Sequence, residues 1–303
     1  MARSPQQVQQ TPLEQLTEMN ERVGKTRKRS AKPRDPTKKV ERFYRAQLKS
    51  LVRSISKAVE EEVIPVVKEE KSAYRADAAP EYTADGYADR IIAVIRALSQ
   101  RFVQGEFAEQ YERLARRTVS MAEAESTDAF VKSVNQAVGV DMRPILDQEG
   151  MQEYIQAASW QNAELIKSVP EEYLKRIETA VVGGVRGGDA PTKIARNIRE
   201  ATGVTQRRAE LLARDQTSKL TSEITERRQK QAGIKYFQWI TSKDERVGDD
   251  HRRAARRDVG YGPGIYRWDK PPREGVPGNS TRPNCRCTAK PIFEFELPDK
   301  GKK

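Results

Sequence analysis

The stretch 234–241, IKYFQWIT, marks the place where this sequence changes character. Apolar and polar side chains alternate along it and aromatic rings are frequent, which is the pattern of a β-strand with one buried face. A second strand is expected over TAKPIFEF at 288–295, which follows a long segment rich in Gly, Pro, Asn and Ser. Before Gly233 the apolar spacing is helical. The sequence therefore predicts a mainly α protein with a small α+β C-terminal module and a few strands after residue 233.

The N-terminal half is predicted to form a long helical hairpin. Apolar residues recur every three or four positions over residues 37–74 and again over 85–124, as in long amphipathic helices. Pro65 is expected to kink or end the first helix. The break AAPEYTADG separates the two, and long helices joined by a short turn pack antiparallel.

Shorter helices are predicted between this hairpin and the first strand. Residues 126–138 and 147–167 have helical spacing, and glycine follows the first of them. Ser168 with Glu171 three residues later has the form of a capping box, so a new helix is expected to begin there. Gly203 is expected to break the charged helical run that leads to the strand.

Composition and spacing together divide the chain into four parts. Charged residues make up 33% of the 303 residues and aromatic residues 7%, which indicates solvated helices around modest cores. No apolar run approaches the length of a membrane span, and the N-terminus has no apolar signal region, so a soluble protein made in a cytosol is expected. The predicted parts are a flexible basic arm (1–36), a helical domain (37–187), a C-terminal domain (188–296) and a tail (297–303).

The arm is the most basic part of a chain whose net charge is +12. Residues 1–53 hold 14 Lys and Arg against 5 Asp and Glu, and RVGKTRKRSAKPR at 22–34 has seven basic residues and no acidic one. Such a block contacts nucleic-acid phosphates without reading sequence, or serves only as a solubilising tail. The candidate DNA-binding residues are Arg22, Lys25, Arg27, Lys28, Arg29, Lys32 and Arg34.

Three metal-ligating side chains are confined to residues 251–287. Cys285 and Cys287 are the only cysteines and His251 is the only histidine. Two thiolates from one tight turn and one imidazole suit zinc, completed by a carboxylate or water. Asp244, Asp249 and Asp250 are the nearby carboxylates, and the predicted set is Asp244, His251, Cys285 and Cys287 around a structural zinc ion. The alternatives are two reduced thiols, a strained disulfide, and a histidine on a solvated helix face.

Other catalytic patterns are missing from the sequence. It has no G-x-S-x-G, no phosphate-binding Walker loop and no G-x-G-x-x-G, and GGVRGGD at 183–189 follows a predicted helix, as a linker would. A protein that is not an enzyme, with no catalytic residue, is therefore expected.

The order of motifs over roughly residues 190–295 resembles the phage head morphogenesis family, the minor head proteins similar to the phage Mu gene F product. The resemblance rests on Asp244, on His251 and on the run Pro283-Asn284-Cys285-Arg286-Cys287, preceded by a charged helix and an aromatic strand that ends at Trp239. One departure is Arg214-Asp215-Gln216, where family members usually have Arg-Thr-Glu.

The resemblance implies a portal-associated minor head protein that acts in procapsid assembly, DNA packaging or DNA ejection. Its implied partners are the phage portal protein, other capsid proteins and double-stranded DNA bound non-specifically. Its implied location is the virion, in the head interior near the portal, and the host cytoplasm during assembly. The alternatives are a zinc-dependent enzyme or toxin-like domain acting on nucleic acid through Asp244, His251 and Arg214, and a basic DNA-binding protein of the host.

Overall fold

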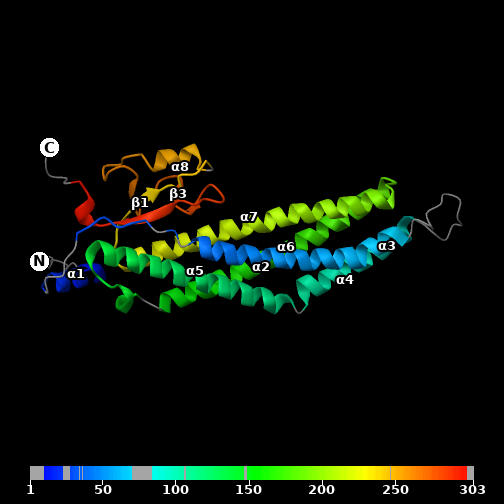
Figure 1. Ribbon diagram of the computed structural model, residues 1–303, viewed down its shortest axis with the longest axis horizontal. Coiled ribbons are helices and arrows are strands. Elements are labelled where there is room, and N and C mark those ends of the chain that lie inside the picture. The colour runs from blue at the N-terminus through cyan, green and yellow to red at the C-terminus, as the bar shows by residue number, and fades with distance from the viewer. Residues whose placement is uncertain are drawn as a thin grey trace, which may run out of the picture. The chain divides into compact units, whose positions relative to one another are not determined.

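The computed structural model describes residues 10–22, 28–33, 35, 37–69, 84–105, 107–146, 149–245 and 247–298. These residues are mainly helical, and the strands all follow residue 233 (Figure 1). The predicted fold class, mainly α with a small α+β module at the C-terminal end, is confirmed.

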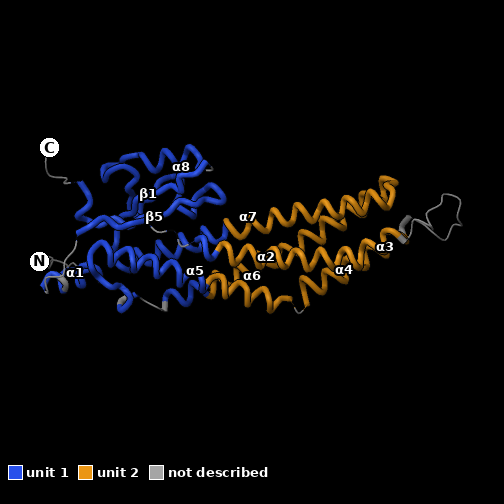
Figure 2. Tube along the Cα trace, viewed as in Figure 1, with its two compact units in different colours: residues 1–40, 120–155, 215–303 blue, residues 41–119, 156–214 orange. Residues whose placement is uncertain are grey.

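The chain forms two compact units, each built from segments that are not contiguous in sequence (Figure 2). The all-helical unit comprises residues 41–119 and 156–214, and the strand-containing unit comprises residues 1–40, 120–155 and 215–303. This division differs from the contiguous parts 37–187 and 188–296, because the boundaries between the units fall inside long continuous helices.

The all-helical unit buries two apolar clusters. Its helical elements, several of which continue into the other unit, are α2 (Thr37–Ala58), η1 (Val59–Val63), α3 (Ile64–Glu69), α4 (Ala84–Ser99), η2 (Gln100–Gln104), α5 (Phe107–Val138), α6 (Glu149–Arg186) and α7 (Pro191–Gln231). One cluster includes Ile55, Ile91 and Ile177, and the other includes Tyr44 and Leu48. The stripes that predicted the hairpin therefore face these cores.

Pro65 neither ends nor interrupts the first helix of the hairpin. A π-helical turn, η1, precedes it directly, and α3 continues past it to Glu69. A proline ring collides with the carbonyl group four residues earlier in a regular α-helix, and a wider turn relieves that collision. The hydroxyl group of Tyr87, on α4, donates a hydrogen bond of 3.0 Å to the carbonyl of Val67, on α3.

Three other predicted helix boundaries are wrong. The helix expected over 85–124 stops at Gly105, where an added Cβ would lie 3.1 Å from two carbonyl oxygens, and α5 then continues to Val138. α6 runs through Pro170, and α7 runs through Gly203. In α6, Val169 and Tyr173 are both buried beside the proline, so tertiary packing outweighs the local stop signal.

The strand-containing unit is built on a three-stranded antiparallel sheet of order β2-β1-β5. β1 (Tyr236–Ile240) and β5 (Thr288–Ile292) lie within the two predicted strands, which are confirmed. Between them the chain forms α8 (Asp249–Ala254), β2 (Ile265–Arg267), β3 (Gly275–Val276) and β4 (Asn279–Ser280). Phe237 and Trp239 alternate inward from β1 and pack in one cluster with both cysteines.

The described part of the predicted arm has more structure than expected. Pro12–Arg22 form the helix α1, whose Leu13 and Leu16 pack against an apolar cluster of the strand-containing unit. In the segment 28–33, Ala31 is buried and the backbone N–H of Arg29 donates to the carbonyl of Ala137. The described residues of the arm thus have local structure, whereas residues 1–9, 23–27, 34 and 36 lie outside the described residues. Within the described residues, no helix has both the length and the apolarity needed to cross a membrane.

Candidate metal centre

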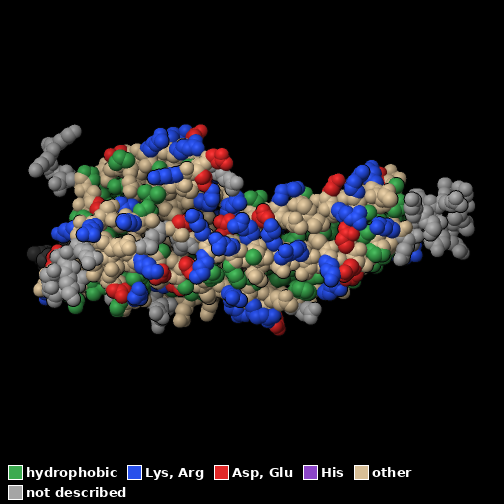
Figure 3. Space-filling view, in the orientation of Figure 1, with side chains coloured by type: hydrophobic (Ala, Val, Ile, Leu, Met, Phe, Trp, Pro, Cys, Tyr) green, Lys and Arg blue, Asp and Glu red, His purple; other side chains and the backbone are tan. Residues whose placement is uncertain are grey.

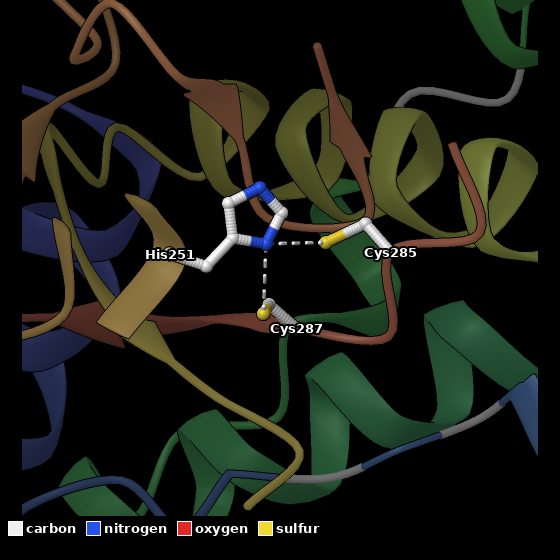
Figure 4. Close-up of side chains that lie close together, drawn as sticks. All are labelled: His251, Cys285 and Cys287. Carbon is white, nitrogen blue, oxygen red and sulfur yellow. Dashed lines mark hydrogen bonds between the residues drawn. The ribbon is translucent and has the colours of Figure 1, made fainter. Parts of the chain in front are cut away.

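His251, Cys285 and Cys287 lie together in the strand-containing unit, with the imidazole ring facing both thiols (Figure 4). The Nδ1 atom of His251 is 3.5 Å from the sulfur of Cys285 and 3.7 Å from the sulfur of Cys287. The three residues are 2%, 6% and 5% exposed. The structure therefore brings together the three side chains that the sequence analysis placed in one site.

The histidine is held by a short helix and an aromatic wall. His251 lies in the first turns of α8, and the hydroxyl group of Tyr266 donates a 2.7 Å hydrogen bond to the carbonyl of Ala254 at the end of that helix. The indole ring of Trp239 lies 5.1 Å from the imidazole ring, centroid to centroid. The Nε2 atom of His251 is buried and has no hydrogen-bond partner among the described residues. The side of the ring that meets polar atoms is therefore the Nδ1 side.

The two cysteines lie on a tight turn, and a hydrogen bond to α7 holds this turn in place. Asn284 has a φ of 58°, a left-handed conformation that asparagine tolerates better than most residues. Its backbone N–H donates a 2.9 Å hydrogen bond to the carboxylate of Asp215, on α7. Asp215 is a site residue that sequence reasoning treated only as a departure from the family pattern. In the sequence, the asparagine directly before Cys285 is the feature that indicates a left-handed backbone position there, and such a position needs a hydrogen-bond partner to hold it.

Backbone groups approach the sulfur atoms closely. The N–H of Gly278 donates to the sulfur of Cys285 at 3.4 Å, and Gly278 has a φ of 86°. A Cβ at this position would lie 3.0 Å from the Cβ of Ser222 and 3.1 Å from the carbonyl of Ser218, so glycine is required both by conformation and by space.

The pKa values of the two thiols are shifted in opposite directions. The hydrogen bond with Cys287 is the main cause that lowers the pKa of Cys285 well below its ordinary value. The same hydrogen bond, together with burial, raises the pKa of Cys287. The arrangement thus favours one thiolate, at Cys285, and disfavours two without a positive charge between them.

Asp244, predicted as the fourth ligand, does not belong to the cluster. The group whose ligand atoms lie within 4.8 Å of one another contains only His251, Cys285 and Cys287 among the described residues. The carboxylate of Asp244 instead forms an ion pair with Arg286, the residue between the two cysteines. The arginine neutralises the carboxylate from the same turn that directs the thiols toward His251. Arg214, named in the enzyme alternative, belongs to the all-helical unit, where it lies 3.7 Å from Glu41.

The structure describes only some of the predicted DNA-binding residues. Lys25, Arg27 and Arg34 lie outside the described residues. The described members are exposed, and two have acidic neighbours: Arg22 lies 2.9 Å from Glu18, and Lys28 lies 3.9 Å from Glu21. The exposed described members are Arg22, Lys28, Arg29 and Lys32.

The fold and the site define a mainly helical protein whose small C-terminal β-module encloses a buried His-Cys-Cys cluster. Residues 175–290 match the family described as Phage Mu protein F like protein, and this part of the chain is similar to that family. The resemblance drawn from the order of motifs is confirmed by this match.

One relative extends the similarity to most of the chain. An "Uncharacterized protein" of Haemophilus influenzae (strain ATCC 51907 / DSM 11121 / KW20 / Rd) is 28% identical over 272 residues, which cover 89% of this chain and 57% of that protein. The chain therefore spans little more than half the length of this relative. No solved structure matches.

Proposed function

We propose that this protein is a structural and assembly component of a tailed-phage head, a minor head protein associated with the portal. The observation that carries the proposal is the match of residues 175–290 to the Phage Mu protein F-like family. The region covers the strands β1 and β2, the helix α8 and both cysteines, so the whole candidate metal centre lies within it. The proposal assigns the cluster no catalytic role and places the protein in the head, with portal and capsid proteins as partners.

Particle composition tests this function. Quantitative mass spectrometry of purified phage particles carrying the gene is expected to find the protein at low copy, comparable with the portal protein and far below the major capsid protein. Procapsids purified before packaging are the matched comparison, since an assembly component is present in them as well. Absence from both kinds of particle contradicts the proposal. Presence in procapsids alone contradicts a role in ejection and leaves the assembly role in place.

We further propose that the basic arm contacts double-stranded DNA without sequence specificity. The seven residues carry positive charge with no acidic residue among them, and the described members are exposed. On the visible face of the molecule, Lys and Arg side chains are instead interspersed with Asp and Glu (Figure 3). Phosphate contacts release counterions, so a segment of one charge sign gives binding that weakens steeply with salt.

Neutralising the arm is expected to flatten this salt dependence. The variant replaces Arg22, Lys25, Arg27, Lys28, Arg29, Lys32 and Arg34 with Gln. Each lost phosphate contact reduces the slope of log K against log salt by about 0.9, which fluorescence anisotropy with a duplex oligonucleotide measures. A matched control replaces Lys57, Arg113 and Arg116, exposed lysine and arginine residues of the all-helical unit, with Gln. An unchanged slope in the arm variant, or an equal change per residue in the control, contradicts the arm as the DNA contact.

A further inference from the structure

We propose that His251 Nδ1, Cys285 Sγ and Cys287 Sγ bind one structural zinc ion, and that Asp244 is not a ligand. The inference is independent of the proposed function, because it rests on three side chains of the strand-containing unit and their surroundings. These residues come from segments 34 and 36 positions apart, and the fold brings them within ligand distance of one another.

The distances fit a tetrahedral metal. With Zn–S distances of about 2.3 Å and Zn–N distances of about 2.0–2.1 Å, tetrahedral coordination places a nitrogen and a sulfur ligand about 3.5 Å apart. The two nitrogen–sulfur distances in the cluster are 3.5 and 3.7 Å. Both nitrogen–sulfur separations are thus those of ligands around one ion, and all three donor atoms lie within 4.8 Å of one another.

A simple hydrogen bond explains this arrangement less well. A proton on Nδ1 points toward one acceptor, whereas the two sulfur atoms lie at nearly the same distance from Nδ1. Burial fixes the charge that the ion must supply, because two thiolates in an apolar cluster with Phe237 and Trp239 are stable only with a compensating cation. A zinc ion with two thiolates is electrically neutral, and a neutral His251 then offers the Nδ1 lone pair to the ion.

The surroundings leave room for a fourth ligand without Asp244. A cavity of ≈ 40 Å³ borders Cys287 and Gly278, and its other lining includes hydroxyl groups of α7. This volume exceeds the roughly 10–15 Å³ that a water molecule needs. The Asp244 carboxylate is engaged by Arg286. Cys287 is the one ligand that lines this cavity, and with Asp244 engaged the proposal assigns water to the fourth position.

A zinc ion here would restrain a part of the chain that has little regular structure. The segment 241–287 contains a six-residue helix and strands of two or three residues, yet it carries all three ligands. Short elements of this kind bury too little apolar surface to hold a long loop, and a metal that joins its two ends supplies the missing restraint.

Metal analysis of the full-length protein tests the proposal. After refolding with zinc and removal of excess metal, elemental analysis is expected to find about one zinc per chain. Cobalt in place of zinc is expected to give the intense sulfur-to-cobalt charge-transfer band that thiolate ligation produces. Chelation is expected to lower the melting temperature and to expose both cysteines to iodoacetamide. Less than about 0.1 zinc per chain, or cobalt binding without a charge-transfer band, overturns the proposal.

Three variants assign the ligands. Cys287→Ser and His251→Gln are each expected to reduce the zinc content at least about tenfold at limiting free zinc, whereas Asp244→Asn keeps it. Retention of zinc by the first two variants, or its loss in the third, overturns the ligand set. If a ligand variant does not fold, cobalt spectroscopy of the wild-type protein decides the question, because it requires no substitution.

Discussion

Phe237→Ala is expected to lower the free energy of unfolding of the strand-containing unit by about 3–5 kcal/mol. Phe237 is 0% exposed and lies on β1, the central strand of the sheet, with its ring 4.2 Å from that of Trp268 and 5.9 Å from that of Tyr266, centroid to centroid. Truncation removes these ring contacts and leaves a cavity that the surrounding sheet cannot close, because β1 is paired on both sides. Urea denaturation followed by tryptophan fluorescence measures the loss.

The matched control is Phe295→Ala, the same truncation at an exposed phenylalanine of the same unit. It is expected to cost less than about 1 kcal/mol, because most of what the ring loses is contact with water and with Phe293. Similar losses in the two variants would show that the apolar cluster around Phe237 is not what stabilises the unit. A change in the denaturant dependence itself would indicate a change in the surface exposed on unfolding or a loss of two-state behaviour.

Glu274→Gln is expected to remove a contribution to stability that depends on pH. The Glu274 side chain is 4% exposed, and its carboxylate accepts two hydrogen bonds from Arg257, of 2.8 and 3.2 Å. These hydrogen bonds are the main cause that lowers the pKa of Glu274 from 4.5 to about 2. Because the folded state binds the proton more weakly than the unfolded state, the contribution is present above pH 4.5 and is lost as the pH falls toward 2.

At pH 7 the substitution is expected to cost about 2 kcal/mol, a value reduced from the full pKa difference because Arg257 is partly exposed to water. The difference between wild type and variant should shrink as the pH is lowered from 5 toward 2, as followed by denaturation at each pH. Glu294→Gln, at an exposed glutamate paired with Lys235, is the control and should show a smaller difference. A difference that stays constant with pH would mean that the charge of Glu274 does not stabilise the fold.

The candidate site and the proposed function are connected by their place in the chain. The family match ends at residue 290, and the two cysteines and the histidine all lie inside it. The arm and the metal centre are tested by separate measurements, so failure of either leaves the other proposal standing.

Much of the architecture follows from local patterns. The alternation in 234–241 determined that this segment would be a strand, since a period of two places every second side chain on one face, and β1 shows that burial pattern. The stripes of Val40, Tyr44 and Leu48 determined a helix with one buried face, and all three residues are buried. The scarcity of cysteine and histidine, confined to 251–287, determined which side chains could share a site.

What local patterns could not decide was settled by contacts between distant residues. Pro170 and Gly203 read as helix ends, yet α6 and α7 run through them, and beside Pro170 the buried Val169 and Tyr173 account for this. Asp244 was a plausible ligand by sequence distance, and only the fold showed that Arg286 takes its carboxylate. Asp215 could be recognised as the partner of Asn284 only when the two, 69 positions apart, were seen together. Propensity and periodicity report short-range energies, whereas the partner of a side chain depends on where the rest of the chain packs.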